Sequence, residues 1–322
     1  MGFTTGDLHI DTPLSNLVIG YEPVNTIVQN IFPEVSVSKQ SDKYYTWNKG
    51  DFFRVPASTL RAEKTKGKSV VFNVSSDSYF ADNYALVHEE AFETMGNADQ
   101  ILKSREKRVR GLKNLLMLDW ENRVGSQISS GSNVGSFTTL SGTDQWSDKA
   151  NSDPIGDVEV GRQAIRSTTG ILPNLAIIPE LVMSQLIQHP DLIDRVKYTG
   201  ENDRPGQVTM RALAALFQVD RILVPQSIIN TGEEGQSDSF SDVWGKNVVL
   251  AYVTNGPDPD GVDPSLGYTF RWNAPELQSL PFVAEIWNDP DGGNFENRRV
   301  MTYQDEKITA PELGYVIDSA VA

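Results

Sequence analysis

The chain has 322 residues, of which 39% are hydrophobic and 22% charged, a composition typical of a globular protein with a substantial core. Its net charge of −15 disfavours broad binding to nucleic acid, and the absence of cysteine excludes disulfides, thiolate metal sites and a cysteine nucleophile. No apolar run approaches the ~20 residues of a membrane span, and the N-terminus lacks the features of a secretory signal, so we expect a soluble protein with no membrane partner.

The first 82 residues predict an arm followed by a hairpin. Residues 1–40 mix short apolar groups with prolines that forbid a long helix, so we expect an extended arm with a short helical piece near 24–30. Aromatic and β-branched runs at 44–47 and 69–74 predict the two strands of a long hairpin over 41–82 with a basic tip. The hairpin needs cover for its aromatic side chains, which its own sheet or another subunit could provide.

The next stretch predicts one long helix over 97–128. Apolar residues recur there at helical spacing, and charged residues, among them Lys113 and Glu121, are expected on the opposite side. Such a helix is about 48 Å long, close to the ~50 Å diameter of a compact globule of this chain length. A short helix over 84–95 is predicted to lead into it. The long helix is either an ordinary core helix or a strut along a flat molecule.

From residue 153 onward, helical patterns alternate with short apolar runs, which predicts a mixed α/β unit. The expected helices are 154–170, 181–188, 191–198 and 210–217. The expected strands are 175–178, 221–224 and 248–253. The C-terminal part returns to strands, at 268–272, 282–287, 300–303 and 314–317, with a strong turn at 288–294.

The sequence offers no recognisable active site. The three histidines, His9, His88 and His189, lie outside any metal-binding or catalytic motif. No nucleophile elbow and no phosphate-binding loop is present. Acidic residues near 258–263 lack the spacing and closing glutamate of an EF-hand. We therefore expect no catalytic residue, no cofactor and no metal site.

The order of long hairpin, long helix, α/β unit and second hairpin resembles the major capsid proteins of tailed bacteriophages, which have the Hong Kong 97 fold. Local motifs strengthen the resemblance. They are Asp11, Gly20-Tyr21, Phe32-Pro33-Glu34-Val35-Ser36-Val37, Tyr44, Ser152-Asp153-Pro154-Ile155-Gly156-Asp157, Thr169-Gly170-Ile171-Leu172-Pro173-Asn174, His189-Pro190-Asp191-Leu192 and Trp244-Gly245-Lys246. The resemblance covers nearly the whole chain.

The resemblance implies an α+β fold divided into four parts. Residues 1–40 would be the N-terminal arm and 41–82 the extended loop. Residues 83–152 and 266–309 would form the peripheral domain, with 97–128 as its spine helix. Residues 153–265 and 310–322 would form the axial domain.

The same resemblance implies a structural protein without enzymatic activity, which self-assembles through hexamers and pentamers into an icosahedral head shell around phage double-stranded DNA. The DNA would be enclosed but not specifically bound, in keeping with the acidic balance. A separate scaffolding protein, a portal and a decoration protein would be partners, with assembly in the host cytoplasm and a final location in the virion. The residues expected to contact other subunits are Phe32, Trp47, Phe52, Phe53, Arg61, Lys64 and Lys66.

Two alternatives remain open from the sequence. Another phage structural protein, such as a tail-tube or decoration protein, would also lack an active site. An α/β hydrolase-like enzyme using the central unit is supported only by the alternation of strands and helices, which many unrelated proteins share.

Overall fold

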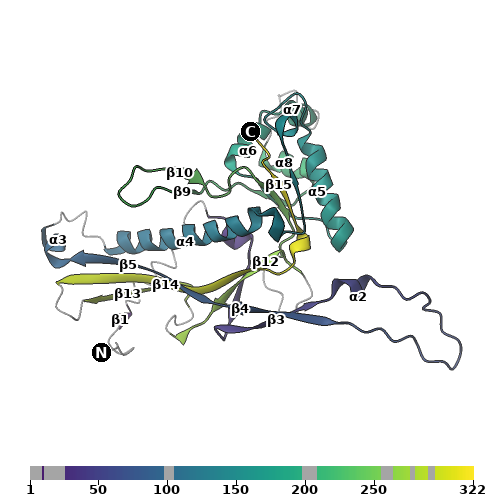
Figure 1. Cartoon of the computed structure of the whole chain (residues 1–322), viewed down its shortest axis with the longest axis horizontal. Coiled ribbons are helices and arrows are strands. Elements are labelled where there is room, and N and C mark those ends of the chain that lie inside the picture. The colour runs from purple at the N-terminus through teal and green to yellow at the C-terminus, as the bar shows by residue number, and fades with distance from the viewer. Residues whose placement is uncertain are drawn as a thin grey trace.

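The computed structural model describes residues 9–10, 26–97, 105–197, 209–254, 264–275, 280–288 and 294–322. A long helix lies along a large sheet, a second α/β unit stands over one end of that helix, and a hairpin projects far from the body (Figure 1). The long helix is thus a strut along an elongated molecule.

The large sheet is six-stranded and is organised around β14, its longest strand. β14 pairs with β5 over ten residues on one edge, and with β13 and then β12 on the other. The outer strands β1 and β2 pair with β13 and β12. The strands are β1 (His9–Ile10), β2 (Glu34–Val37), β5 (Asp82–Ala91), β12 (Gly267–Trp272), β13 (Val283–Asn288) and β14 (Phe295–Ile308).

The helix predicted over 84–95 is wrong, because most of this segment is the strand β5. Tyr84, Leu86 and His88 are less exposed than their neighbours, the alternation of a strand with one face on the core. Tyr84 and Leu86 pack against the main hydrophobic core. Only the last part is helical, as the short helix α3 (Phe92–Asn97).

The long helix α4 (Arg105–Ser129) has 25 residues, about 38 Å at 1.5 Å per residue. The predicted start at residue 97 coincides with the end of α3, and residues 98–104, between the two helices, lie outside the described part. The apolar face follows the predicted periodicity, but Lys113 and Glu121 are buried, contrary to expectation. The buried apolar residues of α4 are Val109, Leu112, Leu116, Met117, Trp120, Val124 and Ile128.

The short helical piece expected in the arm is present as the 3-10 turn η1 (Val28–Asn30). Val28, Ile31 and Phe32 are fully buried in the core beneath α4. The described part of the arm therefore lies on its own subunit.

The second unit is built on a five-stranded sheet, in the order β6-β15-β11-β7-β8, with its own hydrophobic core. Most of its elements were predicted, and α5 shows why. Asp153 accepts a hydrogen bond from the backbone nitrogen of Gly156 at 2.9 Å, and Gly170 ends the helix with a φ of 75°. The strands are β6 (Ser136–Thr139), β7 (Leu175–Ile177), β8 (Arg221–Leu223), β11 (Val248–Ala251) and β15 (Gly314–Asp318). The helices are α5 (Pro154–Thr169), α6 (Glu180–Leu186), α7 (Pro190–Lys197) and α8 (Met210–Phe217).

A small hairpin of β9 (Ile228–Asn230) and β10 (Phe240–Asp242) projects from this unit and was not predicted. In Figure 1 it points away from the large hairpin.

The large hairpin pairs β3 (Ser41–Trp47) with β4 (Val74–Phe80), and the helix α2 (Lys49–Phe53) follows β3. The predicted strand at 69–74 is misplaced, because the ladder ends where Asn48 donates its backbone N–H to the carbonyl of Asn73 at 2.9 Å. Only Ala81 separates β4 from β5. Residues 74–91 thus form a nearly continuous extended segment, about 60 Å long, running from the hairpin into the large sheet.

Candidate assembly surface

The base of the hairpin is fixed to the large sheet by an aromatic stack. The Phe270 ring of β12 lies between Tyr44 and Tyr79, with centroid distances of 5.3 and 4.7 Å. Phe80 donates its backbone N–H to the Asp305 carboxylate at 2.9 Å. These contacts cover the residues nearest the body and leave the outer hairpin free.

Beyond the base, aromatic side chains gather on the exposed part of the hairpin. Trp47 packs edge-on against Phe52 at 6.1 Å, and Phe52 packs against Phe72 at 4.9 Å. At least half of each side chain remains exposed. An exposed aromatic group of this size is typical of an interaction site.

The helix α2 is held in place at both ends. Asn48 caps it by accepting from the backbone nitrogen of Gly50 at 3.0 Å, and Lys49 forms an ion pair with Glu312 at 3.3 Å. Its last residue, Phe53, brings its ring close to the turn at Gly170. α2 therefore orients the aromatic cluster relative to the second unit.

The tip of the hairpin, residues 54–68, carries five cations and one carboxylate. Its local structure is a turn in which Arg61 donates to the carbonyl of Thr65 at 3.0 Å, with Lys64 in the left-handed region at φ 62°. Lys64 and Lys66 are exposed. The tip is a basic surface outside the body of the subunit (Figure 1).

Six of the seven residues proposed from the sequence as contacts therefore lie together on the projecting hairpin, all exposed: Trp47, Phe52, Phe53, Arg61, Lys64 and Lys66. The prediction that Phe32 contacts another subunit is wrong. Its side chain is 0% exposed, and its ring lies so close to Gly267 that any Cβ there would clash. Phe32 packs inside its own subunit, so its side chain has no surface to offer a neighbour.

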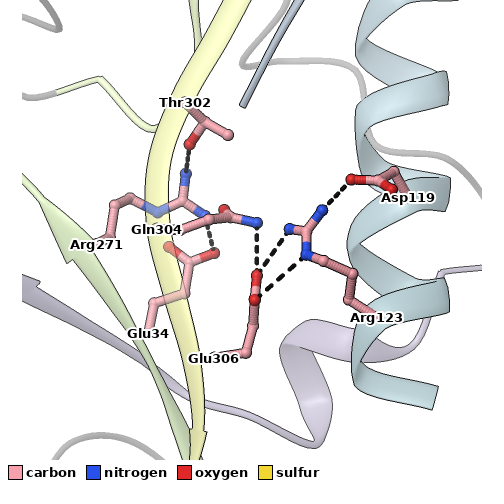
Figure 2. Close-up of polar contacts among 7 residues, drawn as sticks. All are labelled: Glu34, Asp119, Arg123, Arg271, Thr302, Gln304 and Glu306. Atoms are coloured by element: carbon pink, nitrogen blue, oxygen red, sulfur yellow. Dashed lines mark hydrogen bonds and ion pairs between the residues drawn. The ribbon is translucent and has the colours of Figure 1, made fainter. Parts of the chain in front are cut away.

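The interface between α4 and the large sheet contains a polar network that the sequence did not reveal (Figure 2). Arg123 of α4 binds both oxygens of Glu306, at 2.9 and 3.4 Å, and also pairs with Asp119. Gln304 donates to Glu306 at 2.9 Å. Nearby, Arg271 pairs with Glu34 at 2.8 Å and donates to Thr302 at 3.3 Å. These bonds fix the position of the helix along the sheet.

A second buried ion cluster lies further along β14. Arg298, which is 1% exposed, donates to Glu90 and Glu296, each at 2.6 Å, and Arg108 of α4 also pairs with Glu90. Burial raises the pKa of Glu90, but the bonds from Arg298 and Arg108 outweigh it and the pKa is lowered. The charges satisfy one another, which is typical of a structural cluster.

Glu121 joins α4 to the base of the β9–β10 hairpin. Its buried carboxylate accepts from the Ser227 hydroxyl, and from Trp244 Nε1 at 2.9 Å. Burial raises the pKa of Glu121, although both hydrogen bonds oppose this shift. The helical periodicity did not predict that Glu121 is buried and hydrogen-bonded, because Ser227 and Trp244 lie more than a hundred residues away in the sequence.

The residues that could serve catalysis are not brought together in the described part of the chain. His189 is buried against Ser152 at 3.1 Å, while His88 lies beside Arg108, and burial lowers its pKa. Among described residues, no group of three or more metal-binding side chains is arranged to hold an ion. Residues 258–263, weighed as a calcium loop, lie outside this part. No described helix has the length and apolarity required to cross a membrane.

No protein-family model matches the chain. Two curated relatives do. The major capsid protein of Pseudomonas phage JBD67 is 27% identical over 317 residues, 97% of each chain. The major capsid protein of Burkholderia phage BcepMu is 31% identical over 273 residues, which covers 81% of this chain and 83% of that protein.

Among solved structures, a phage-related protein from Bordetella bronchiseptica superimposes with a TM-score of 0.73 at 26% identity, covering 97% of this chain and 98% of that one. The resemblance read from the sequence is confirmed, as is the α+β, Hong Kong 97-like fold. The role is structural, in the capsid shell of the virion. The chain belongs to the major capsid proteins of bacteriophages.

Proposed function

We propose that the hairpin of residues 41–82 is an extended loop that lies over a neighbouring subunit in an icosahedral shell. The supporting observation is the exposed cluster of Trp47, Phe52 and Phe72, whose rings contact one another on a projecting hairpin. Burying one aromatic side chain removes about 150–250 Å² from water, so this cluster would favour association strongly. Phe53, Arg61, Lys64 and Lys66 would extend the contact towards the tip.

The remaining assignments follow from this proposal. Residues 83–135 and 266–309 would be the peripheral domain, with α4 as its spine helix. Residues 136–265 and 310–322 would be the axial domain, around which subunits gather as hexamers and pentamers. The boundary expected at residue 152 moves to 135, because β6 pairs with β15 in the sheet of the second unit. Residues 1–40 would be the arm, of which 26–40 lie on their own subunit.

The shell would be assembled in the host cytoplasm, with a separate scaffolding protein, a portal and a decoration protein as partners. It would enclose double-stranded DNA without binding it specifically, since a net charge of −15 disfavours adhesion to phosphate. No enzymatic activity is proposed, because the relatives' role is structural.

The test is to express the chain alone and with its neighbouring reading frames, and to image the products by negative-stain electron microscopy. Closed polyhedral particles are expected. Tubes would indicate a tail protein instead. A monomer at high concentration, both alone and with each neighbouring reading frame, would contradict the proposal.

A deletion variant tests the role of the loop. Removing residues 54–68 spares α2, Asn73 and the β3–β4 ladder, so the subunit should remain folded with unchanged thermal unfolding. Normal particles from this variant would contradict the proposed loop contact.

A further inference from the structure

The β9–β10 hairpin presents a sheet face that nothing in its own subunit covers. Phe240 pairs with Asn230 and Asp242 with Ile228, so all four side chains lie on one face. Phe240 is 64% exposed and Ile228 51%. Two large apolar side chains on a two-stranded ribbon are costly to leave in water.

Acidic residues surround this apolar face. Residues 222–245 contain Glu233, Glu234, Asp238 and Asp242, and no lysine or arginine. Within the described part of the chain, none of these four carboxylates forms an ion pair. The hairpin therefore combines apolar contacts with uncompensated negative charge.

The hairpin is also preorganised. The Asn230 side chain accepts from the backbone nitrogens of Gly232 and Ser239, both at 3.0 Å, and donates to Asp238 at 2.8 Å. Its base is bonded to α4 through Ser227 and Glu121. A surface that is already ordered loses little entropy when a partner binds.

The complementary surface on the same chain is the tip of the large hairpin. Residues 54–68 carry five cations and one carboxylate, and Leu60 at the tip is 92% exposed. In Figure 1 the β9–β10 hairpin and the large hairpin point in opposite directions along the long axis, so they cannot meet within one subunit. Only a second copy can bring these charges together.

We propose that the basic tip of one subunit docks on the β9–β10 hairpin of a neighbouring copy. Leu60 packs against Ile228 and Phe240, while the tip cations meet Glu233 and Glu234. This inference rests on the proposed loop function and names the surface that receives the loop. Because both charged surfaces are exposed, salt screens the attraction between them, with a Debye length of about 10 Å at 0.1 M. We therefore expect the contact to weaken as the salt concentration is raised.

Cysteine cross-linking tests the contact directly, because the native chain has no cysteine. Particles of the double variant Lys66→Cys/Glu234→Cys are treated with a short bismaleimide and run on a denaturing gel. A ladder of covalent oligomers is expected. The control pair Lys66→Cys/Gln163→Cys, which places the second cysteine on α5, should give no ladder.

A charge exchange tests the energetics. Lys64→Glu/Lys66→Glu and Glu233→Lys/Glu234→Lys should each lower particle yield by about tenfold, because like charges then face one another. Combining all four should restore most of the yield.

The outcomes separate the two proposals. The docking is overturned, and the shell function stands, if the native chain forms particles but two results fail. The first is the covalent ladder from the double-cysteine variant. The second is the restored particle yield when the two charge-reversed pairs are combined. A cross-link from Glu234→Cys to a different virion protein also overturns it. If the native chain forms no particles, the proposed function fails and the docking falls with it.

Discussion

Asp51 Oδ2 accepts hydrogen bonds from both the backbone and the side-chain nitrogen of Asn73, at 2.9 and 2.8 Å. Asp51 precedes the basic tip in the chain and Asn73 follows it, so their bonds close the neck of a 21-residue loop. These bonds also lower the pKa of Asp51.

Asp51→Ala should open this neck. We expect faster cleavage within residues 54–72 by a probing protease, because the tip is then tethered only by its flanking strands. Thermal unfolding of the body should not change, since the neck lies outside the large sheet. Asp77→Ala is the matched control, because it removes a carboxylate that bonds Tyr44 across the ladder and leaves the neck intact. Equal cleavage in the two variants would contradict the assignment.

Replacing the exposed aromatic residues should separate assembly from folding. Trp47→Ser/Phe52→Ser should change the free energy of unfolding of the isolated subunit by less than ~1 kcal/mol, because both side chains are already largely in water. Particle yield, measured by sedimentation, should fall sharply. Tyr79→Ser on the same hairpin is the control: its ring is 6% exposed and stacked on Phe270, so we expect it to destabilise the subunit itself.

Glu121 should make stability depend on pH in the opposite sense to most carboxylates. Its pKa in the folded protein is raised above the ordinary value of 4.5, so folding favours the protonated form. Its contribution is therefore full below pH 4.5 and is lost as the pH rises through the raised pKa.

The variant Glu121→Gln keeps an acceptor for Ser227 and Trp244 but cannot ionise. Relative to the native chain, it should gain stability from pH 4.5 upward, by up to ~1.4 kcal/mol per unit of pKa shift. Urea unfolding between pH 4.5 and 8 measures this difference. Glu121→Ala should be destabilised throughout that range, because it leaves both buried donors unpaired. A constant difference between Glu121→Gln and the native chain would contradict the prediction.

Breaking the network of Figure 2 should be costly. Arg123→Met leaves the buried Glu306 carboxylate with Gln304 as its remaining side-chain donor among the described residues, so we expect a loss of about 3 kcal/mol in the free energy of unfolding. Adding Glu306→Gln should recover part of that loss, because the uncompensated charge is removed. Lys39→Met, which breaks a solvent-exposed pair with Asp42, should leave the free energy of unfolding nearly unchanged.

The α/β unit could be predicted from the sequence because its signals are local. Asp153 and Gly170 bound α5 by chemistry that acts within one helical turn, and the uniformly apolar strand β7 is buried on both faces. Those residues specify their structure without reference to distant parts of the chain.

The sequence-based predictions were wrong where a residue or strand far away in the sequence determines the local structure or the burial of a side chain. Residues 84–95 contain good helix formers, but β14, some two hundred residues later, offers a ten-residue ladder and overrides propensity. Lys113 and Glu121 look like surface residues on a helical wheel, yet Phe282 lies under the first and Ser227 bonds the second. The strands β9 and β10, each of three residues, are too short to leave a periodic signal.

The location of most candidate contacts could also be predicted from the sequence, while their role in contacting other subunits stays a prediction. The aromatic and basic composition of the hairpin predicted that six residues lie on a projecting surface. This prediction was possible because it depends on the composition of the hairpin itself and not on a distant part of the chain. Phe32 was misassigned because a glycine 235 positions later, Gly267, makes room for its ring.

The near-continuity of β4 and β5 through Ala81 has a mechanical consequence. A pull on the outer hairpin along its axis is carried straight into β5, whose hydrogen bonds to β14 run across that direction. All ten residue pairs between β5 and β14 are then loaded in shear at the same time, rather than being separated one after another by a force perpendicular to the strands. Tension that enters through the outer hairpin would therefore be carried by the large sheet along the direction in which the β5–β14 ladder resists most strongly.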